Sequence, residues 1–91
     1  MTFDLDRRWR LSEQVALRPE PFGALAYDFG TRRLSFLKSR ALLALVEALG
    51  AHPSAREAAR AVGVAGGELD RCRQALAVLA ATGMIRAQAA P

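Results

Sequence analysis

The spacing of apolar residues changes once along the chain, and this change constrains the fold more than any other feature. Up to about residue 38, apolar side chains tend to recur at every second position, which is typical of β-strands. Beyond that point they recur about every 3.6 positions, as in amphipathic helices. Strands followed by helices predict an α+β domain in which the helices cover one face of an antiparallel sheet.

Three strands are predicted, at residues 14–18, 23–29 and 32–36. Pro19 and Pro21 end the first strand, because proline has no amide proton and its φ angle is fixed. Gly30 and Thr31 separate the other two strands, and a Gly-X pair between alternating runs predicts a two-residue type II′ hairpin turn. The second strand would then lie in the middle of the sheet.

The predicted turn also fixes which residues lie opposite each other in the hairpin. On one face of the sheet the opposed residues are large and apolar, namely Tyr27 with Leu34 and Leu25 with Phe36. On the other face they are small or charged, namely Ala26 with Ser35 and Asp28 with Arg33. We therefore expect the helices to pack against the apolar face, and a cross-strand ion pair to form on the other.

Capping residues mark three predicted helices, at about residues 39–50, 54–63 and 68–82. The first begins at Ser35 or Ser39 and ends at Gly50. Ser54 and Glu57 form a capping box at the start of the second helix. The third helix carries apolar residues at spacings of three and four, and these should face the core: Leu69, Cys72, Leu76 and Leu79.

Three strands followed by three helices, the last two joined by a glycine-rich turn, predict a winged helix-turn-helix. A short apolar segment at residues 84–85 is expected to add to the core, and residues 86–91 are expected to fray. We expect one domain over residues 1–91, with residues 9–85 as its approximate ordered part.

The residue types that common enzymes require are scarce in this sequence. His52 is its one histidine and Cys72 its one cysteine, and neither lies in a catalytic or metal-binding motif. The sequence therefore predicts a binding protein that is not an enzyme and that uses no metal or cofactor. A charged N-terminus and short apolar runs predict no signal peptide and no membrane partner, and hence a cytoplasmic protein.

Basic residues outnumber acidic ones by 13 to 9, and the isoelectric point is about 10.6, which suggests nucleic acid as one partner. A winged helix that reads DNA places the outward face of its third helix in the major groove. Here that face would carry Asp70, Gln74, Ala77, Val78 and Ala81. These residues contact phosphates and bases poorly. A DNA-binding regulator is therefore the alternative reading and a peptide partner the favoured one.

An unpaired sheet edge is the feature that favours a peptide. With residues 23–29 in the middle, the strand at residues 32–36 leaves one edge open, and an extended peptide can add to such an edge. Arg32, Arg33 and Lys38 would attract an acidic peptide. Two other readings stay open: these charges could merely keep the edge from aggregating, or two edges could close a homodimer.

Two runs of residues resemble the family of peptide chaperones of mycofactocin biosynthesis. They are Arg-Pro-Glu-Pro-Phe-Gly at residues 18–23 and Phe-Gly-Thr-Arg-Arg-Leu-Ser-Phe-Leu-Lys at residues 29–38. The resemblance extends from about Trp9 to Ile85. It implies a non-catalytic protein that binds a ribosomally made precursor peptide and presents it to a radical S-adenosylmethionine (SAM) maturase. More distantly, the chain is similar to the peptide chaperone of pyrroloquinoline quinone biosynthesis and to other precursor-recognition domains.

The same resemblance implies where the peptide binds. In the wider family the peptide pairs with the third strand and lies in the cleft between that strand and the third helix. Carried over by position, the strand residues are Arg32, Arg33, Leu34, Ser35 and Phe36, and the helix residues are Leu69, Arg71, Arg73, Ala75, Leu76 and Val78. Either helix flank could line the cleft, that of Arg71, Ala75 and Val78 or that of Arg73, Ala77 and Ala80. A structural domain that docks on a larger enzyme without binding peptide is a further alternative.

Overall fold

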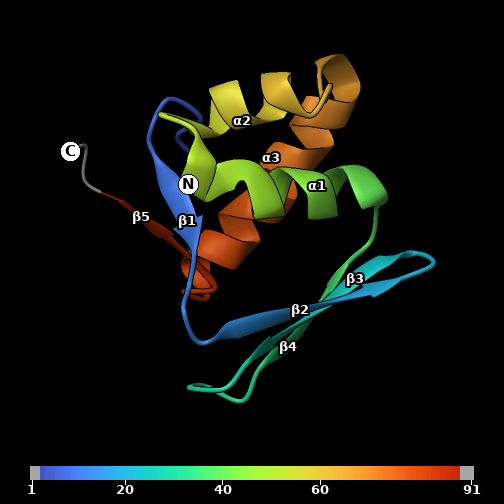
Figure 1. Ribbon diagram of the computed structural model, residues 1–91, viewed down its shortest axis with the longest axis vertical. Coiled ribbons are helices and arrows are strands. Elements are labelled where there is room, and N and C mark those ends of the chain that lie inside the picture. The colour runs from blue at the N-terminus through green and yellow to red at the C-terminus, as the bar shows by residue number, and fades with distance from the viewer. Residues whose placement is uncertain (1–2, 89–91) are drawn as a thin grey trace.

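A computed structural model describes residues 3–88 of the chain. Its elements are β1 (Trp9–Leu11), β2 (Val15–Glu20), β3 (Gly23–Asp28), β4 (Leu34–Leu37), α1 (Arg40–Ala48), the short 3₁₀ helix η1 (Leu49–Ala51), α2 (Ala55–Ala61), α3 (Gly66–Ala81) and β5 (Ile85–Ala87). Figure 1 shows the three α-helices grouped together, with the β2–β3–β4 sheet extending below them. The predicted α+β class, with a three-stranded antiparallel sheet and three helices, is confirmed.

The register predicted for the hairpin is confirmed. β3 lies between β2 and β4, and the opposed residues of β3 and β4 are Tyr27 with Leu34, Ala26 with Ser35 and Leu25 with Phe36. β2 continues to Glu20 and so runs through Pro19, which was expected to end it. An edge strand tolerates proline when the missing N–H would point away from the neighbouring strand.

The predicted two-residue turn is wrong, because residues 29–32 form a four-residue loop between β3 and β4. Asp28 N donates a hydrogen bond to Arg33 O at 2.9 Å, and Arg32, at φ 62°, donates from its N to Asp28 O at 2.7 Å. The Asp28 carboxylate accepts hydrogen bonds from the N atoms of Gly30 at 2.8 Å and Thr31 at 3.1 Å. Its predicted ion pair with Arg33 is therefore replaced by bonds to the loop's own backbone.

The face of the sheet that meets the helices is the opposite of the predicted one. Ala24 and Ala26 of β3 and Leu37 of β4 are buried, whereas Leu34 and Phe36 are more than half exposed. α1 packs directly on β3, and small side chains let the helix approach the sheet closely. The large apolar side chains consequently lie on the face turned away from the helices.

Side-chain caps start the first two helices where they were expected. Ser39 Oγ accepts a hydrogen bond from Leu42 N at 3.0 Å, so that Ser39, and not Ser35, begins α1. Ser54 Oγ accepts one from Glu57 N at 3.1 Å at the start of α2. The carboxylate of Glu57 accepts a hydrogen bond from Arg60 at 2.8 Å. Of the two hydrogen bonds of the predicted capping box, the structure therefore has the one accepted by the serine.

A second sheet, formed by β1 and β5, was missed by the sequence analysis. Trp9 lies opposite Ala87 and Leu11 opposite Ile85, so residues 86–87, expected to fray, belong to a strand. Phe3 stacks on Trp9 with ring centroids 4.5 Å apart, and it is buried, although it precedes the part of the chain expected to be ordered. Residues 89–91 of the predicted tail lie outside the described residues.

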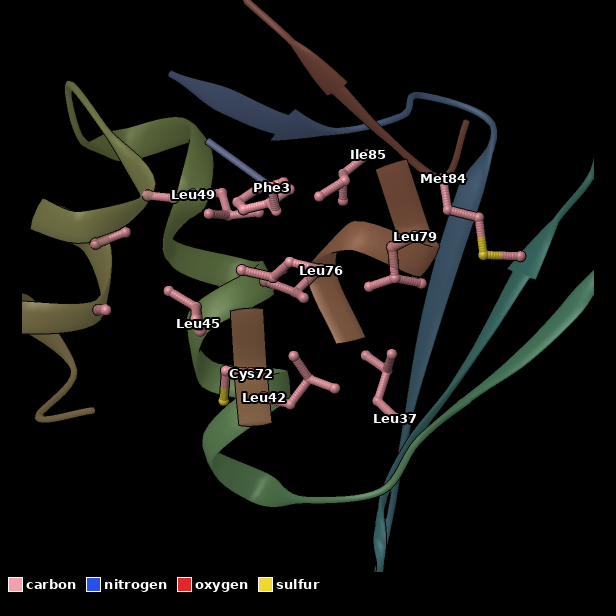
Figure 2. Packing of buried hydrophobic residues seen from close by; sticks show 14 of the residues in the cluster. Phe3, Leu37, Leu42, Leu45, Leu49, Cys72, Leu76, Leu79, Met84 and Ile85 are labelled. Atoms are coloured by element: carbon pink, nitrogen blue, oxygen red, sulfur yellow. The ribbon is translucent and has the colours of Figure 1, made fainter. Parts of the chain in front are cut away.

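The core lies where α1, α3, β4 and the segment before β5 meet. Figure 2 shows Leu37 of β4 pointing toward Leu42 and Leu79, with Leu45 and Leu76 beside them. Of the four α3 residues predicted to face the core, Cys72, Leu76 and Leu79 are buried and Leu69 is half-buried. The expected contribution of residues 84–85 is confirmed, since both side chains are fully buried. Within residues 3–88, no helix has both the length and the apolar character needed to cross a bilayer.

Candidate functional site

The free edge of the three-stranded sheet is β4, and the hydrogen-bonding pattern shows which of its backbone groups are available. In an antiparallel pair, hydrogen-bonded and non-hydrogen-bonded residue pairs alternate. Because Asp28 N bonds to Arg33 O, Ser35 must also point its N–H and C=O toward β3. Leu34 and Phe36 then direct their N–H and C=O away from β3, toward solvent.

The opposite edge, on β2, is poorer in donors. Phe29 N donates to Gln14 O at 2.7 Å, and the same alternation turns Val15, Leu17 and Pro19 away from β3. Pro19 has no N–H, and Val15 N already donates to Ser12 O at 3.1 Å. An incoming strand would therefore find two consecutive outward donors on β4 and one on β2.

Beside the β4 edge lies the sheet face that is turned away from the helices, which we call the outer apolar face. It consists of Phe22, Leu25, Tyr27, Phe29, Leu34 and Phe36. Phe36 is 57% exposed and its ring centroid lies 6.1 Å from that of Phe22. The rings of Tyr27 and Phe29 meet edge to face at 5.1 Å. Contiguous exposed apolar side chains of this kind are typical of an interaction surface.

Four of these residues, Leu25, Tyr27, Leu34 and Phe36, were expected to face the core. The sequence therefore predicted that they share a face of the sheet, but it did not predict their exposure or the addition of Phe22 and Phe29. A signal for the opposite orientation was present in β3. The residues between the large ones are Ala24 and Ala26, and Gly23 precedes them. Such a small-residue face is what a closely approaching helix requires.

Cations lie at both ends of β4. Arg32, Arg33 and Lys38 are exposed, and Arg32 ends the loop that the Asp28 carboxylate organises. On the neighbouring β2, Arg18 is paired with Glu20 at 3.0 Å. The β4 edge is therefore flanked by positive charge, which favours acidic groups in whatever lies along it.

Asp28 gives the loop at residues 29–32 a predictable response to acid. The hydrogen bond from the backbone of Thr31 is the main reason that the pKa of Asp28 lies below its ordinary value of 3.8, and the Gly30 amide adds to this effect against the opposing effect of burial. A lowered pKa means that the carboxylate stabilises the fold above that value and ceases to do so as the pH falls through the lower, folded-state pKa. We therefore expect Asp28→Asn to be less stable than the wild type at pH 7, by a difference that shrinks as the pH falls below 3.8. Urea unfolding at pH 7 and at a series of acidic pH values measures this, and a constant difference would contradict it.

Arg73 and Val78, two of the predicted helix residues, line grooves to which no β4 residue contributes. Arg73 lines a groove with Phe3 and Leu5, and Val78, which is 59% exposed, lines a larger one with Phe3 and Trp9. Both grooves are lined by α3 and the N-terminal segment, together with β5 in the larger groove and Arg56 of α2 in the smaller one. The flank of Arg73, Ala77 and Ala80 thus faces residues 3–9.

The other predicted helix residues differ in their exposure. Leu76 is fully buried and belongs to the core, so a peptide cannot reach it in this structure. Ala75 and Leu69 are half-buried, and Arg71 is exposed. Of the predicted site, the strand residues are therefore more accessible as a group than the helix residues.

Side chains suited to metal binding do not gather anywhere in residues 3–88. Burial is the main reason that the pKa of the Cys72 thiol is raised, which makes it a poor nucleophile. What the described residues offer is a strand edge, an apolar face and flanking cations, and these are the elements of a binding surface.

Comparison with known proteins identifies relatives of this chain. The model of the peptide chaperone MftB family matches residues 8–86. A peptide chaperone MftB of Mycobacterium ulcerans is 57% identical over 88 residues, which are 97% of this chain and 81% of that protein. Proteins of the same name from Mycobacterium tuberculosis and Mycolicibacterium smegmatis are 55% and 53% identical, over 91% and 93% of this chain and 76% and 83% of theirs.

No solved structure matches the chain. The family resemblance inferred from residues 18–23 and 29–38 is confirmed by the family model and by these relatives. The family match spans both sheets and all three helices, and it includes the whole of β4. The chain therefore belongs to the peptide chaperone MftB family.

Proposed function

We propose that this protein is a non-catalytic peptide chaperone that binds the ribosomal mycofactocin precursor peptide as an added strand on β4 and presents it to a radical SAM maturase. The observation that carries the proposal is the unpaired β4 edge, where Leu34 and Phe36 point their backbone groups outward beside the outer apolar face. The names of its relatives support the peptide chaperone role. The proposal includes a cytoplasmic location and one recognition domain over residues 1–91, with the three main helices and β2–β4 as a winged helix-turn-helix.

Strand addition assigns a role to each part of the site. The N–H and C=O groups of Leu34 and Phe36 hydrogen-bond the peptide backbone, which supplies affinity without regard to sequence. Every second peptide side chain then lies beside the side chains of Leu34 and Phe36 and extends the outer apolar face. Arg32 and Arg33 attract carboxylates of the peptide and accelerate its association.

The same geometry accounts for presentation. A peptide bound on β4 becomes the outermost strand of the sheet, and its own far edge and outer face stay open to solvent. The maturase can therefore reach a peptide that has already been ordered. Ordering the peptide in advance reduces the conformational entropy that the enzyme complex must lose.

Calorimetric titration of the protein with the precursor peptide encoded nearest its gene tests the proposal. We expect saturable binding of one peptide per chain, with Kd rising roughly fivefold between low and physiological salt because Arg32 and Arg33 steer the peptide. The double variant Arg32→Glu/Arg33→Glu should associate more slowly and lose most of this salt dependence. Absence of binding by the folded protein, together with a salt-dependent shift of duplex DNA, would contradict the proposal and favour the DNA-binding alternative.

A further inference from the structure

We propose that the groove between α3 and β5 binds an extended segment of a second protein, in which apolar and acidic residues alternate, as a third strand on the β1–β5 sheet. The groove is separate from the β4 site, because none of the β4 residues lines it. The inference does not depend on the proposed function. It adds a second place at which this small protein can hold a polypeptide.

The groove has the size and the lining of a peptide site. Its volume is about 750 Å³. The stacked rings of Phe3 and Trp9 and the side chain of Ile85 form an apolar part of its wall. The helix side consists mainly of the small residues Ala77, Ala80 and Ala81 and of Val78, so another backbone can come close to α3.

The register of the β1–β5 sheet leaves an edge for hydrogen bonding along this groove. Ser12 N donates to Met84 O and Gln88 N donates to Arg8 O, both at 2.8 Å. By alternation, Arg86 also bonds toward β1, and Ile85 and Ala87 direct their N–H and C=O away from it. Both of these residues line the groove.

Charge on the other face of this sheet indicates which side chains the added strand should carry. Arg10 lies directly opposite Arg86, and like charges in opposed positions destabilise a strand pair. Arg10 has one distant partner, Glu13 at 3.8 Å, which is mostly exposed. Asp28 offsets part of this repulsion, since the charge of Arg86 is among the causes that lower the pKa of Asp28. A carboxylate on an added strand, next to Arg86, would relieve it further.

The rim of the groove carries more positive than negative side chains. Arg7 and Arg86 both line it and are exposed. Asp4 lies there as well, so the rim carries two cations against one carboxylate. Alternation along a strand places apolar side chains in the groove and acidic ones beside Arg86, so the expected ligand pattern is apolar-acidic-apolar.

The test uses the full chain labelled with ¹⁵N and the blocked heptapeptide Val-Asp-Val-Asp-Val-Asp-Val as probe. We expect saturable amide shifts at Ala77, Ala81, Ile85 and Ala87. Ala81→Trp should fill the groove and weaken binding at least tenfold, whereas Gln74→Trp, on an exposed position of the same helix outside the groove, should bind like the wild type. A probe with Lys in place of Asp should bind at least tenfold more weakly.

Backbone variants separate this site from β4. Ala87→Pro removes an outward N–H of β5 and should weaken probe binding, while Ala87→Ser keeps the N–H and the affinity. Leu34→Pro should leave probe binding unchanged. Absence of saturable shifts up to millimolar probe, or shifts confined to β4 and the outer apolar face, would overturn the proposal. So would a wild-type dimer that Ala81→Trp converts to a monomer, because the groove would then be filled by a second copy of this chain.

Discussion

Leu34→Pro should weaken binding of the precursor peptide by roughly 30-fold while leaving the protein folded. Proline removes one of the two outward N–H donors of β4 and leaves a peptide carbonyl without its partner. A lost hydrogen bond and an unsatisfied acceptor together cost about 2 kcal/mol, and every 1.4 kcal/mol is about tenfold in Kd. The ladder between β3 and β4 is untouched, because Leu34 does not donate toward β3.

Two matched variants isolate the effect of this N–H. Leu34→Ala also removes the exposed leucine side chain but keeps the N–H, so its affinity should fall much less than that of Leu34→Pro. Ser35→Pro removes a donor that points toward β3, and it should lower the thermal unfolding midpoint instead. Calorimetry and thermal melts measure both quantities. Equal affinities for Leu34→Pro and Leu34→Ala would show that the peptide does not pair with β4.

Gly23→Ala should destabilise the fold by at least about 3 kcal/mol. Gly23 has φ 147°, a conformation that residues with a side chain rarely adopt. A Cβ atom there would also collide with Leu37 O and lie 2.8 Å from Ser39 N. Both groups are backbone at the junction of β4 and α1, and they cannot move aside without displacing the strand from the helix.

Gly63→Ala provides the comparison for this prediction. Gly63 has φ 78°, but no atom lies within 4 Å of a Cβ built there, so its substitution carries backbone strain without collision. We expect a loss of about 1 kcal/mol for Gly63→Ala and a much larger one for Gly23→Ala. Urea unfolding of both variants measures the difference. Equal losses would mean that the close approach at Gly23 is unimportant.

The hairpin illustrates what its sequence could predict. The alternation of residues 23–29 and 32–36 was sufficient for the register, because a shift by one residue would exchange the two faces. The loop type depended on the Asp28 carboxylate, which competes with a tight turn for the amides of Gly30 and Thr31. The alternation of apolar and polar residues carries no information about this competition for backbone amides.

The orientation of the sheet could not be predicted from apolar content. Burial of large apolar side chains favours Leu25, Tyr27, Leu34 and Phe36 in the core, and that expectation considers the free protein alone. In the structure α1 packs on β3 at the small side chains of Ala24 and Ala26, so the face that carries the large side chains is turned away from the helices.

The β1–β5 sheet could not be predicted for two reasons. Its strands are too short to show an alternation of apolar residues, and they are too far apart in the sequence for their pairing to be inferred. Each has three residues, and Trp9 pairs with Ala87 across nearly the whole chain. The candidate site was predictable on the strand side, where an edge follows directly from strand order. The helix side follows only from a family resemblance by position, and it stays a prediction. Ala77 and Ala80 of one flank and Val78 of the other line a groove with Phe3 and Trp9.

Pro19 also limits how copies of this protein can assemble. If β2 of one molecule could pair with β4 of the next, the contact would repeat without closing and would build a filament. Proline at an outward position of β2 opposes that contact, so growth of the three-stranded sheet is favoured at β4. The favoured contact between two copies of this sheet is then β4 against β4, which closes after two molecules and uses the edge proposed for the peptide. At high protein concentration and without peptide, such pairing would compete reversibly with peptide binding. Added peptide would convert the dimer to peptide-bound monomers.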